Sequence, residues 1–399
     1  MREAGAHGPP LWPAYVATYL FMVGQWASGV AVPLQVGLLG GSIGVAGTIA
    51  AVRFGLGALF QLPFGAVADA WGTRRTLFVA IAGNAVVNLV PLLAAASRSI
   101  WVLYLWAVLS GLTASLFLPA MSAFVAGNSP DRSRGSAFGW LTLGTHTGIA
   151  SGPAIGGLVW EHFGVAPTYL ISASIGLTAL IGPLLMAGAQ RLRLRFAGLP
   201  AMVAAVARDR AIVGVWLAAL AIGLPWGAVS GLFPLFGSSL GMAAGSIGLL
   251  LALQSAANGA SRVPLGRLID RRAVPPLTAA GTALAYTGIT SLLGLQTGPV
   301  GIGIIFVSGI VALAFTLMLV QVVISERVAP ELRATGLGGY GTTLSAGLGI
   351  GPLLAGTVAD QGGFAAGFGL VAGIGALVAI AAAAVLRGTR RADRAGMHT

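Results

Sequence analysis

Residues 76–96 read TLFVAIAGNAVVNLVPLLAAA and contain no charged side chain. A helix needs about 20 consecutive apolar residues to cross about 30 Å of hydrocarbon, and this stretch has that length. Arg74 and Arg75 precede it and Arg98 follows it, so charge is confined to its two ends. Similar apolar runs recur along the whole chain, which predicts membrane-spanning helices rather than buried strands.

The composition agrees with a membrane protein and excludes a soluble one. Of the 399 residues, 56% are hydrophobic and only 8% are charged, and the mean hydropathy is +0.90. Soluble domains carry roughly 25% charged residues, so a soluble fold would lack the polar surface to cover itself. The 61 glycines suit helices that pack closely in a bilayer. Cysteine is absent, which excludes disulfide scaffolds, thiolate metal sites and cysteine nucleophiles.

Twelve apolar runs lie between turn signals, and each is a predicted helix. The first run is longer than a signal-peptide core and lacks the usual basic start, so we expect it to be retained. The runs span residues 12–38, 42–64, 76–96, 100–124, 136–160, 166–188, 211–236, 244–266, 276–296, 299–324, 335–359 and 363–386.

The two halves of the chain repeat. One set of pairs is offset by 201 residues: Pro33-Leu34 with Pro234-Leu235, Pro63 with Pro264, and Asp69 with Asp270. Another is offset by 199 residues: Arg134 with Arg333, Gly152-Pro153 with Gly351-Pro352, and Gly157 with Gly356. A nearly constant offset at six places indicates duplication of one six-helix unit. We therefore predict an all-α integral membrane fold of twelve helices: an N-terminal six-helix bundle at 1–189, a cytoplasmic linker at 190–210, and a pseudo-symmetric C-terminal six-helix bundle with a short basic tail at 211–399.

The arginines predict how the chain crosses the membrane. All 22 basic residues are arginines, against 10 acids, which gives a net charge of +12. Except for Arg53, Arg98 and Arg262, they fall at the N-terminus or in segments between alternate apolar runs. The positive-inside rule makes those segments and both termini cytoplasmic, so the charge reflects topology and not nucleic-acid binding. Lysine-free, Gly- and Ala-rich usage further indicates a GC-rich bacterial genome, and hence the plasma membrane.

Two copies of one motif follow the second predicted helix of each half. The first reads Gly65-Ala-Val-Ala-Asp69-Ala-Trp-Gly72-Thr-Arg74-Arg75, and the shorter second copy reads Gly266-Arg-Leu-Ile-Asp270-Arg271-Arg272. The pattern resembles the signature loop of the major facilitator superfamily, and the resemblance covers essentially the whole chain. Glycine lets two helix ends approach closely, and the aspartate can pair with arginines and a neighbouring helix N-terminus, latching the halves in one state. The alternative is a basic turn that only sets topology.

The fifth predicted helix carries a second motif, GIASGPAIGG at 148–157. It resembles the glycine–proline motif of the superfamily's exporters, which implies outward transport. Gly148, Gly152 and Gly156 form one smooth face, beside Gly157, and Pro153 removes an internal hydrogen bond and permits a bend. The alternative is an ordinary packing face of small residues.

The chain also departs from the exporter pattern. Proton-coupled drug exporters of this family often carry an acid about nine residues before a proline like Pro33, where this chain reads Gly-Gln-Trp at 24–26. They often carry an arginine in the fourth helix, where this chain has Ala107. The predicted helix limits put Glu161 and Asp360 at outer helix ends and no acid near mid-membrane. A conventional embedded carboxylate relay is therefore missing, and the coupling ion stays open.

Arg53 and His146 are the ionisable side chains predicted at mid-depth. A charge there costs roughly 3 kcal/mol or more unless it meets water or a partner, so both are functional candidates. The repeat offset takes Arg53 to Gln254, as a shared central cavity would produce. Arg53 could bind an anionic substrate group or clamp helix carbonyls, and His146 could carry a proton or be a packed neutral imidazole. Arg262 lies two turns from the cytoplasmic Asp270 and is set aside as a snorkelling residue.

Further amide and aromatic side chains could line the same cavity and suit amphiphilic organic molecules. Without lysine the chain cannot form a phosphate-binding P-loop, and its four histidines do not cluster as metal ligands or as an enzyme site. We therefore expect no cofactor, no metal and no enzyme activity. The further cavity candidates are Gln25, Trp26, Trp226, Asn258 and Tyr340.

These residues predict a secondary active transporter of a small organic molecule that works by alternating access. The leading direction is export, as multidrug or metabolite efflux, with protons as a candidate coupling ion. The expected partners are the substrate and the lipid bilayer, no nucleic acid is expected, and we expect a monomer. One alternative is uptake or facilitated diffusion of an anionic metabolite. Another, from a different class, is a non-transporting membrane sensor or assembly factor.

Overall fold

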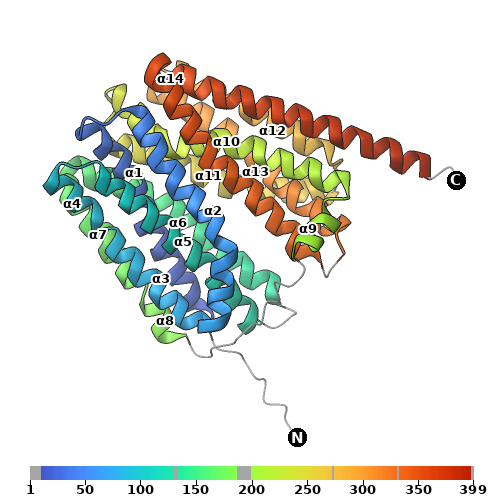
Figure 1. Cartoon of the computed structure of the whole chain (residues 1–399), viewed down its shortest axis with the longest axis horizontal. Coiled ribbons are helices and arrows are strands. Elements are labelled where there is room, and N and C mark those ends of the chain that lie inside the picture. The colour runs from blue at the N-terminus through green and yellow to red at the C-terminus, as the bar shows by residue number, and fades with distance from the viewer. Residues whose placement is uncertain (1–9, 130–132, 187–198, 272–273, 330–331, 397–399) are drawn as a thin grey trace, which may run out of the picture. The chain divides into compact units, whose positions relative to one another are not determined.

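The structure is a computed structural model that describes residues 10–129, 133–186, 199–271, 274–329 and 332–396 (Figure 1). Within these ranges the regular secondary structure is helical, which confirms the predicted fold class. The elements are α1 (Trp12–Leu38), α2 (Ile43–Trp71), α3 (Thr73–Val87), α4 (Val90–Ser97), α5 (Trp101–Asn128), α6 (Arg134–Phe163), α7 (Val165–Thr178), α8 (Ile181–Leu185), α9 (Leu199–Val206), α10 (Arg210–Ser239), α11 (Ala244–Arg271), α12 (Leu277–Ser291), the 3-10 turn η2 (Leu293–Leu295), α13 (Pro299–Arg327) and α14 (Arg333–Gly396).

Each of the twelve predicted apolar runs falls on one of these helices or on a closely spaced pair. The third run is divided between α3 and α4, because Pro91 in the first turn of α4 has no N–H to continue the α3 ladder. The last two runs share α14, which is interrupted at Gly363 by a φ of 74°. Among the described residues, seven segments are long and apolar enough to span a membrane, and the one at 335–388 contains that interruption.

The predicted ends of the second and eighth helices were too early. The second was expected to stop at residue 64, but α2 continues to Trp71, so Gly65 and Asp69 lie on helix and not in a loop. The eighth likewise continues through Gly266 and Asp270 as part of α11. Alanine-rich sequence favours helix, so glycine at 65 does not end α2. The break falls at Gly72, whose φ of 89° suits glycine.

The chain forms two compact units, which differ slightly from a simple division into halves. Unit 1 comprises residues 1–35, 59–195 and 244–252, and unit 2 comprises 36–58, 196–243 and 253–399. The start of α11 therefore belongs with the first half, and the start of α2, up to residue 58, belongs with the second. Each unit contains segments of both sequence repeats.

The core of unit 1 is built on helices from the first repeat. Helices α3, α5 and α7 pack side by side (Figure 1), and Phe21 of α1 stacks on Phe117 of α5 with ring centroids 3.8 Å apart. A buried polar chain joins α1, α4 and α7. The Tyr169 hydroxyl donates to Gln35 Oε1 at 2.6 Å, and Gln35 Nε2 donates to the Pro91 carbonyl at 2.9 Å. Buried polar groups need such partners, so these bonds fix how the three helices pack.

Unit 2 packs mainly around α10, which lies against α12, α13 and α14. Its glycines allow direct backbone contact with α14: a Cβ on Gly223 would lie 2.7 Å from the Leu344 carbonyl oxygen. The repeat offsets take Gln35 and Tyr169 of unit 1 to Phe236 and Phe368, whose rings meet edge to face at 5.7 Å. The second repeat thus packs these positions with aromatic contact where the first uses a hydrogen bond.

Candidate functional site

The structure places the predicted cavity residues in both units. Three lie in unit 1, on α1 and α6, and five lie in unit 2, on α2, α10, α11 and α14. The unit 1 residues are Gln25, Trp26 and His146, and the unit 2 residues are Arg53, Trp226, Gln254, Asn258 and Tyr340.

In unit 1, the backbone of α1 beside Gln25 and Trp26 is held by the glycine face of α6. An added Cβ on Gly152 would lie 2.8 Å from Trp26 Cβ and 2.9 Å from the Val23 carbonyl oxygen. Gln25 is buried, and Trp26 and His146 are half-buried. The two helices therefore approach through backbone atoms, which limits movement of the α1 segment that carries these side chains.

The same glycine face of α6 extends over about two turns. Gly148 and Gly156 also face α1, where added Cβ atoms would lie 2.7 Å from the Tyr19 carbonyl oxygen and 2.5 Å from that of Ala27. Gly157 points elsewhere, toward α11, where its Cβ would lie 3.1 Å from Gly248 Cα. The fifth predicted helix thus makes close backbone contact with one helix from each repeat.

In unit 2, a polar stripe runs along α11. Gln254, Asn258 and Arg262 are spaced four residues apart and so lie on one helical face. Gln254 and Asn258 are 7% and 4% exposed, and Arg262 Nε donates to Asn258 Oδ1 at 3.4 Å. The half-buried Tyr340 of α14 interacts electrostatically with Arg262 and hydrogen-bonds to Gln321 of α13.

Arg262 was not among the predicted cavity residues, but the structure places it in contact with two of them, Asn258 and Tyr340. The spacing between Arg262 and Asp270 predicts a side chain that reaches the cytoplasm, but it does not report on Asn258 and Tyr340, which lie beside Arg262 in the structure. In the described part of the chain, no carboxylate forms an ion pair with Arg262. The four-residue spacing from Gln254 was the available signal, because it places Arg262 on the same face as two predicted cavity residues.

Arg53 is the more deeply buried of the two candidate arginines. It lies on α2 with only 8% of its surface exposed, and its Cζ is 5.4 Å from the centroid of the Phe54 ring. A cation over an aromatic face offsets part of the cost of burying the charge. Trp226 of α10 is half-buried and packs against the core of unit 2.

The motif around Gly72 makes contacts within unit 1. Arg74 Nε donates to the Pro183 carbonyl at 2.6 Å, and its Nη2 donates to the Leu184 carbonyl at 3.2 Å. A cation is favourable at these last carbonyls of α8, where the helix dipole is negative. The Asp69 side chain and Arg272 lie outside the described part of the structure, while Arg75, Asp270 and Arg271 are exposed. The latching role of the aspartates therefore stays a prediction.

Comparison with known protein families shows the family to which the chain belongs. The sequence pattern of the Major Facilitator Superfamily matches residues 14–344 and 215–396. The chain belongs to this superfamily. It is accordingly a multi-pass membrane transporter and not an enzyme.

Individual proteins that resemble this chain are named for different functions. A Salmonella paratyphi A protein named multidrug resistance protein MdtG is 31% identical over 129 residues, which is 32% of this chain and 31% of that one. The chain thus matches about a third of the length of this curated relative. The crystal structure of a bacterial homologue of the human lysosomal transporter Spinster, inward-facing and unoccupied, has a TM-score of 0.75 at 14% identity, covering 94% and 95% of the two chains. The nucleoside transporter NupG has a TM-score of 0.72 at 14% identity, covering 94% and 98%.

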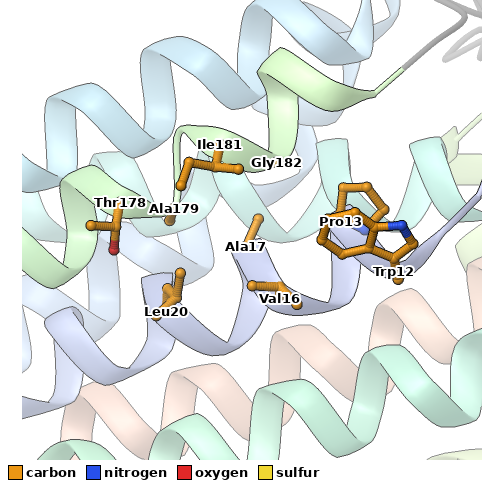
Figure 2. Close-up of a pocket in the computed structure, with 9 residues that line it drawn as sticks. All are labelled: Trp12, Pro13, Val16, Ala17, Leu20, Thr178, Ala179, Ile181 and Gly182. Carbon is orange, nitrogen blue, oxygen red and sulfur yellow. The ribbon is translucent and has the colours of Figure 1, made fainter.

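A hollow on unit 1 is unsuited to substrate. It lies between α1 and the α7–α8 connection, has a volume of about 30 Å³, and is lined by apolar groups (Figure 2). A cavity of that volume has room for only one or two water molecules and is too small for an organic cargo. Trp12 at one end is 53% exposed, which suits an anchor at the membrane interface.

We predict that Gly152→Ala destabilises this transporter. The added methyl group would overlap Trp26 Cβ and the Val23 carbonyl, and overpacking of this kind costs about 1–3 kcal/mol. The measurement is the thermal unfolding midpoint of purified protein in detergent, together with the transport rate in proteoliposomes.

Gly139→Ala is the matched control on the same helix, because an added Cβ at Gly139 meets no atom within 4 Å. It should leave the midpoint unchanged or raise it slightly, since alanine favours helix. Equal midpoints for the two variants would contradict the close packing of α6 on α1.

Proposed function

We propose that this chain is a secondary active transporter that exports a small organic molecule across the plasma membrane by alternating access, with both termini in the cytoplasm. The observation that carries the proposal is the dual contact of α6. Its glycine face meets α1 through Gly152, and Gly157 and Pro153 meet α11 through Gly248. A helix that packs closely against both repeats at these glycines can transmit a movement of one repeat to the other.

The direction of transport has separate support. The resemblance of residues 148–157 to the exporter motif favours outward transport, and the partial relative MdtG is named for multidrug resistance. Buried amides and half-buried tryptophans, such as Gln25, Trp26 and Trp226, offer stacking and hydrogen bonds that suit amphiphilic organic molecules.

For the energy source, we propose His146 as the proton carrier. It is half-buried on α6, two residues before Gly148 of the glycine face, and histidine is the side chain that ordinarily titrates near neutral pH. Arg53 would bind an anionic group of the cargo. The predicted lack of an embedded carboxylate makes the imidazole the leading candidate.

A second candidate function is transport of an anionic metabolite by uptake or facilitated diffusion. The observation in its favour is the environment of Arg262, which the structure supports with Asn258 and Tyr340 but, within the described residues, not with a carboxylate. A guanidinium held by neutral partners keeps its charge available for a carboxylate or phosphate. Arg53 would supply a second positive charge on the same unit.

We expect a proton gradient to drive extrusion of a subset of labelled drugs and metabolites from proteoliposomes. His146→Gln should abolish the dependence on the gradient, because glutamine does not titrate, while leaving downhill exchange measurable. The assay compares initial rates with the gradient imposed and collapsed. Retention of gradient-driven transport in both His146→Gln and His146→Ala would refute the proton-carrier role.

The anionic alternative makes a different prediction. Arg53→Gln and Arg262→Gln should each weaken binding of carboxylate-bearing compounds at least tenfold, about 1.4 kcal/mol, and should change binding of neutral ones little. Equilibrium binding to purified protein measures both.

Arg267→Gln is the matched control for Arg262→Gln, because Arg267 is exposed one turn further along α11. If both cavity variants lose neutral and anionic ligands alike, the two arginines serve structure and the anionic alternative fails.

A further inference from the structure

Two seams of small residues join the sequence repeats, and each lies inside one unit. The first seam, in unit 1, sets Pro153, Gly157 and Glu161 of α6 against Gly245 and Gly248 of α11. The second seam, in unit 2, sets Pro352, Gly356 and Asp360 of α14 against Gly44 and Gly47 of α2. Every residue of the first seam corresponds to one of the second: the α6 residues are offset by 199 from those of α14, and the α11 residues by 201 from those of α2.

The seams agree in detail as well as in position. An added Cβ on Gly157 would lie 3.1 Å from Gly248 Cα, and one on Gly356 would lie 3.1 Å from Gly47 Cα. Added Cβ atoms on Gly248 and Gly47 would each overlap the carbonyl oxygen of the facing proline. In both seams the helix backbones touch with no side chain between them, so a small separation would break the contact.

A carboxylate closes the same end of each seam. Glu161 Oε2 accepts from the Gly245 N–H at 2.8 Å, and Asp360 Oδ1 accepts from the Gly44 N–H at 2.9 Å. Both amides belong to the first turn of a helix, where N–H groups lack intrahelical partners and the dipole is positive. Each acid therefore clasps the N-terminus of a helix from the other repeat. The distribution of arginines predicts that this is the outer end.

We propose that Glu161 and Asp360 are the outer gating residues of the transport cycle. Each clasp is made while the outer end of its seam is closed and is released when that end opens. The inference rests on the proposed alternating-access function, and it assigns a role to two acids that the substrate cavity does not use. Because the helix N-terminus is an uncharged partner, a clasp can break without leaving a second charge unpaired.

The two clasps differ in one respect. Asp360 also accepts from Ser42 Oγ through its Oδ2 at 2.7 Å, whereas the residue equivalent to Ser42 in the first seam is Ala243. Among the described residues, Asp360 thus accepts from two donors and Glu161 from one. The first seam should therefore open more readily than the second.

Hydrogen exchange measured by mass spectrometry on the purified protein tests the clasps. In Glu161→Gln, deuterium uptake in the first turn of α11 should rise at least threefold, while uptake in the first turn of α2 stays unchanged. Asp360→Asn should give the reverse pattern. In the unmodified protein, the first turn of α11 should exchange faster than that of α2.

Ser42→Ala is a milder variant that still tests the proposal if Glu161→Gln or Asp360→Asn does not fold. It gives the second clasp the single-donor form of the first, so exchange in the first turn of α2 should approach that of α11. Glu326→Gln, an exposed acid on α13, is the control and should change neither region. Unchanged exchange at both turns in Glu161→Gln and Asp360→Asn would overturn the proposal.

Transport measurements distinguish a failure of the gating proposal from a failure of the proposed export direction. Losing a clasp populates the outward-open state, so the KM measured for cargo on the inner side should rise at least threefold with little loss of maximal rate. Altered exchange with an altered inner KM supports the gate, even if the cargo proves to move inward. Altered exchange with an unchanged KM on both sides would leave the acids as simple helix caps and overturn the gating role.

Discussion

Close approach of helix backbones is the constraint on which this structure depends. In a bilayer the lipid tails are as apolar as leucine, so burying a side chain between two helices gains little, and association relies on tight packing and hydrogen bonds. The chain meets this constraint with glycine: α6 meets α1 at Gly152 and α11 at Gly157, and α10 meets α14 at Gly223. Where side chains are absent, the contact is lost over a short displacement.

This constraint links packing to transport. A seam that joins the two repeats by backbone contact has two clear states, closed and separated, and transporters of this architecture move one repeat against the other. Gene duplication placed such a seam in each unit. The carboxylates Glu161 and Asp360 add a directional bond at the end of each seam, and the extra donor from Ser42 makes the two unequal. The order in which the two seams open then depends on the Ser42 hydroxyl group.

The sequence predicted the helical fold well because apolar length and turn residues report directly on membrane helices. It ended α2 too early, at residue 64, whereas the alanine-rich segment after Gly65 continues the helix to Trp71. It could not predict which side chains meet across the fold. Arg262 was judged by its distance from Asp270 along the helix, and its partner on α14 lies 78 residues away in the sequence. The clasp at Glu161 was equally hidden, although the repeat offsets would have paired it with Asp360.

The central claim is that the seams open and close in every cycle, and thiol cross-linking tests it most directly. The chain contains no cysteine, so Gly41→Cys with Gln361→Cys supplies the only two thiols, each next to a hydrogen-bonded partner of the second clasp. A short thiol cross-linker should stop transport in the double variant and leave each single variant active, and a cleavable linker should restore transport on reduction. Normal transport by fully cross-linked protein would contradict the account.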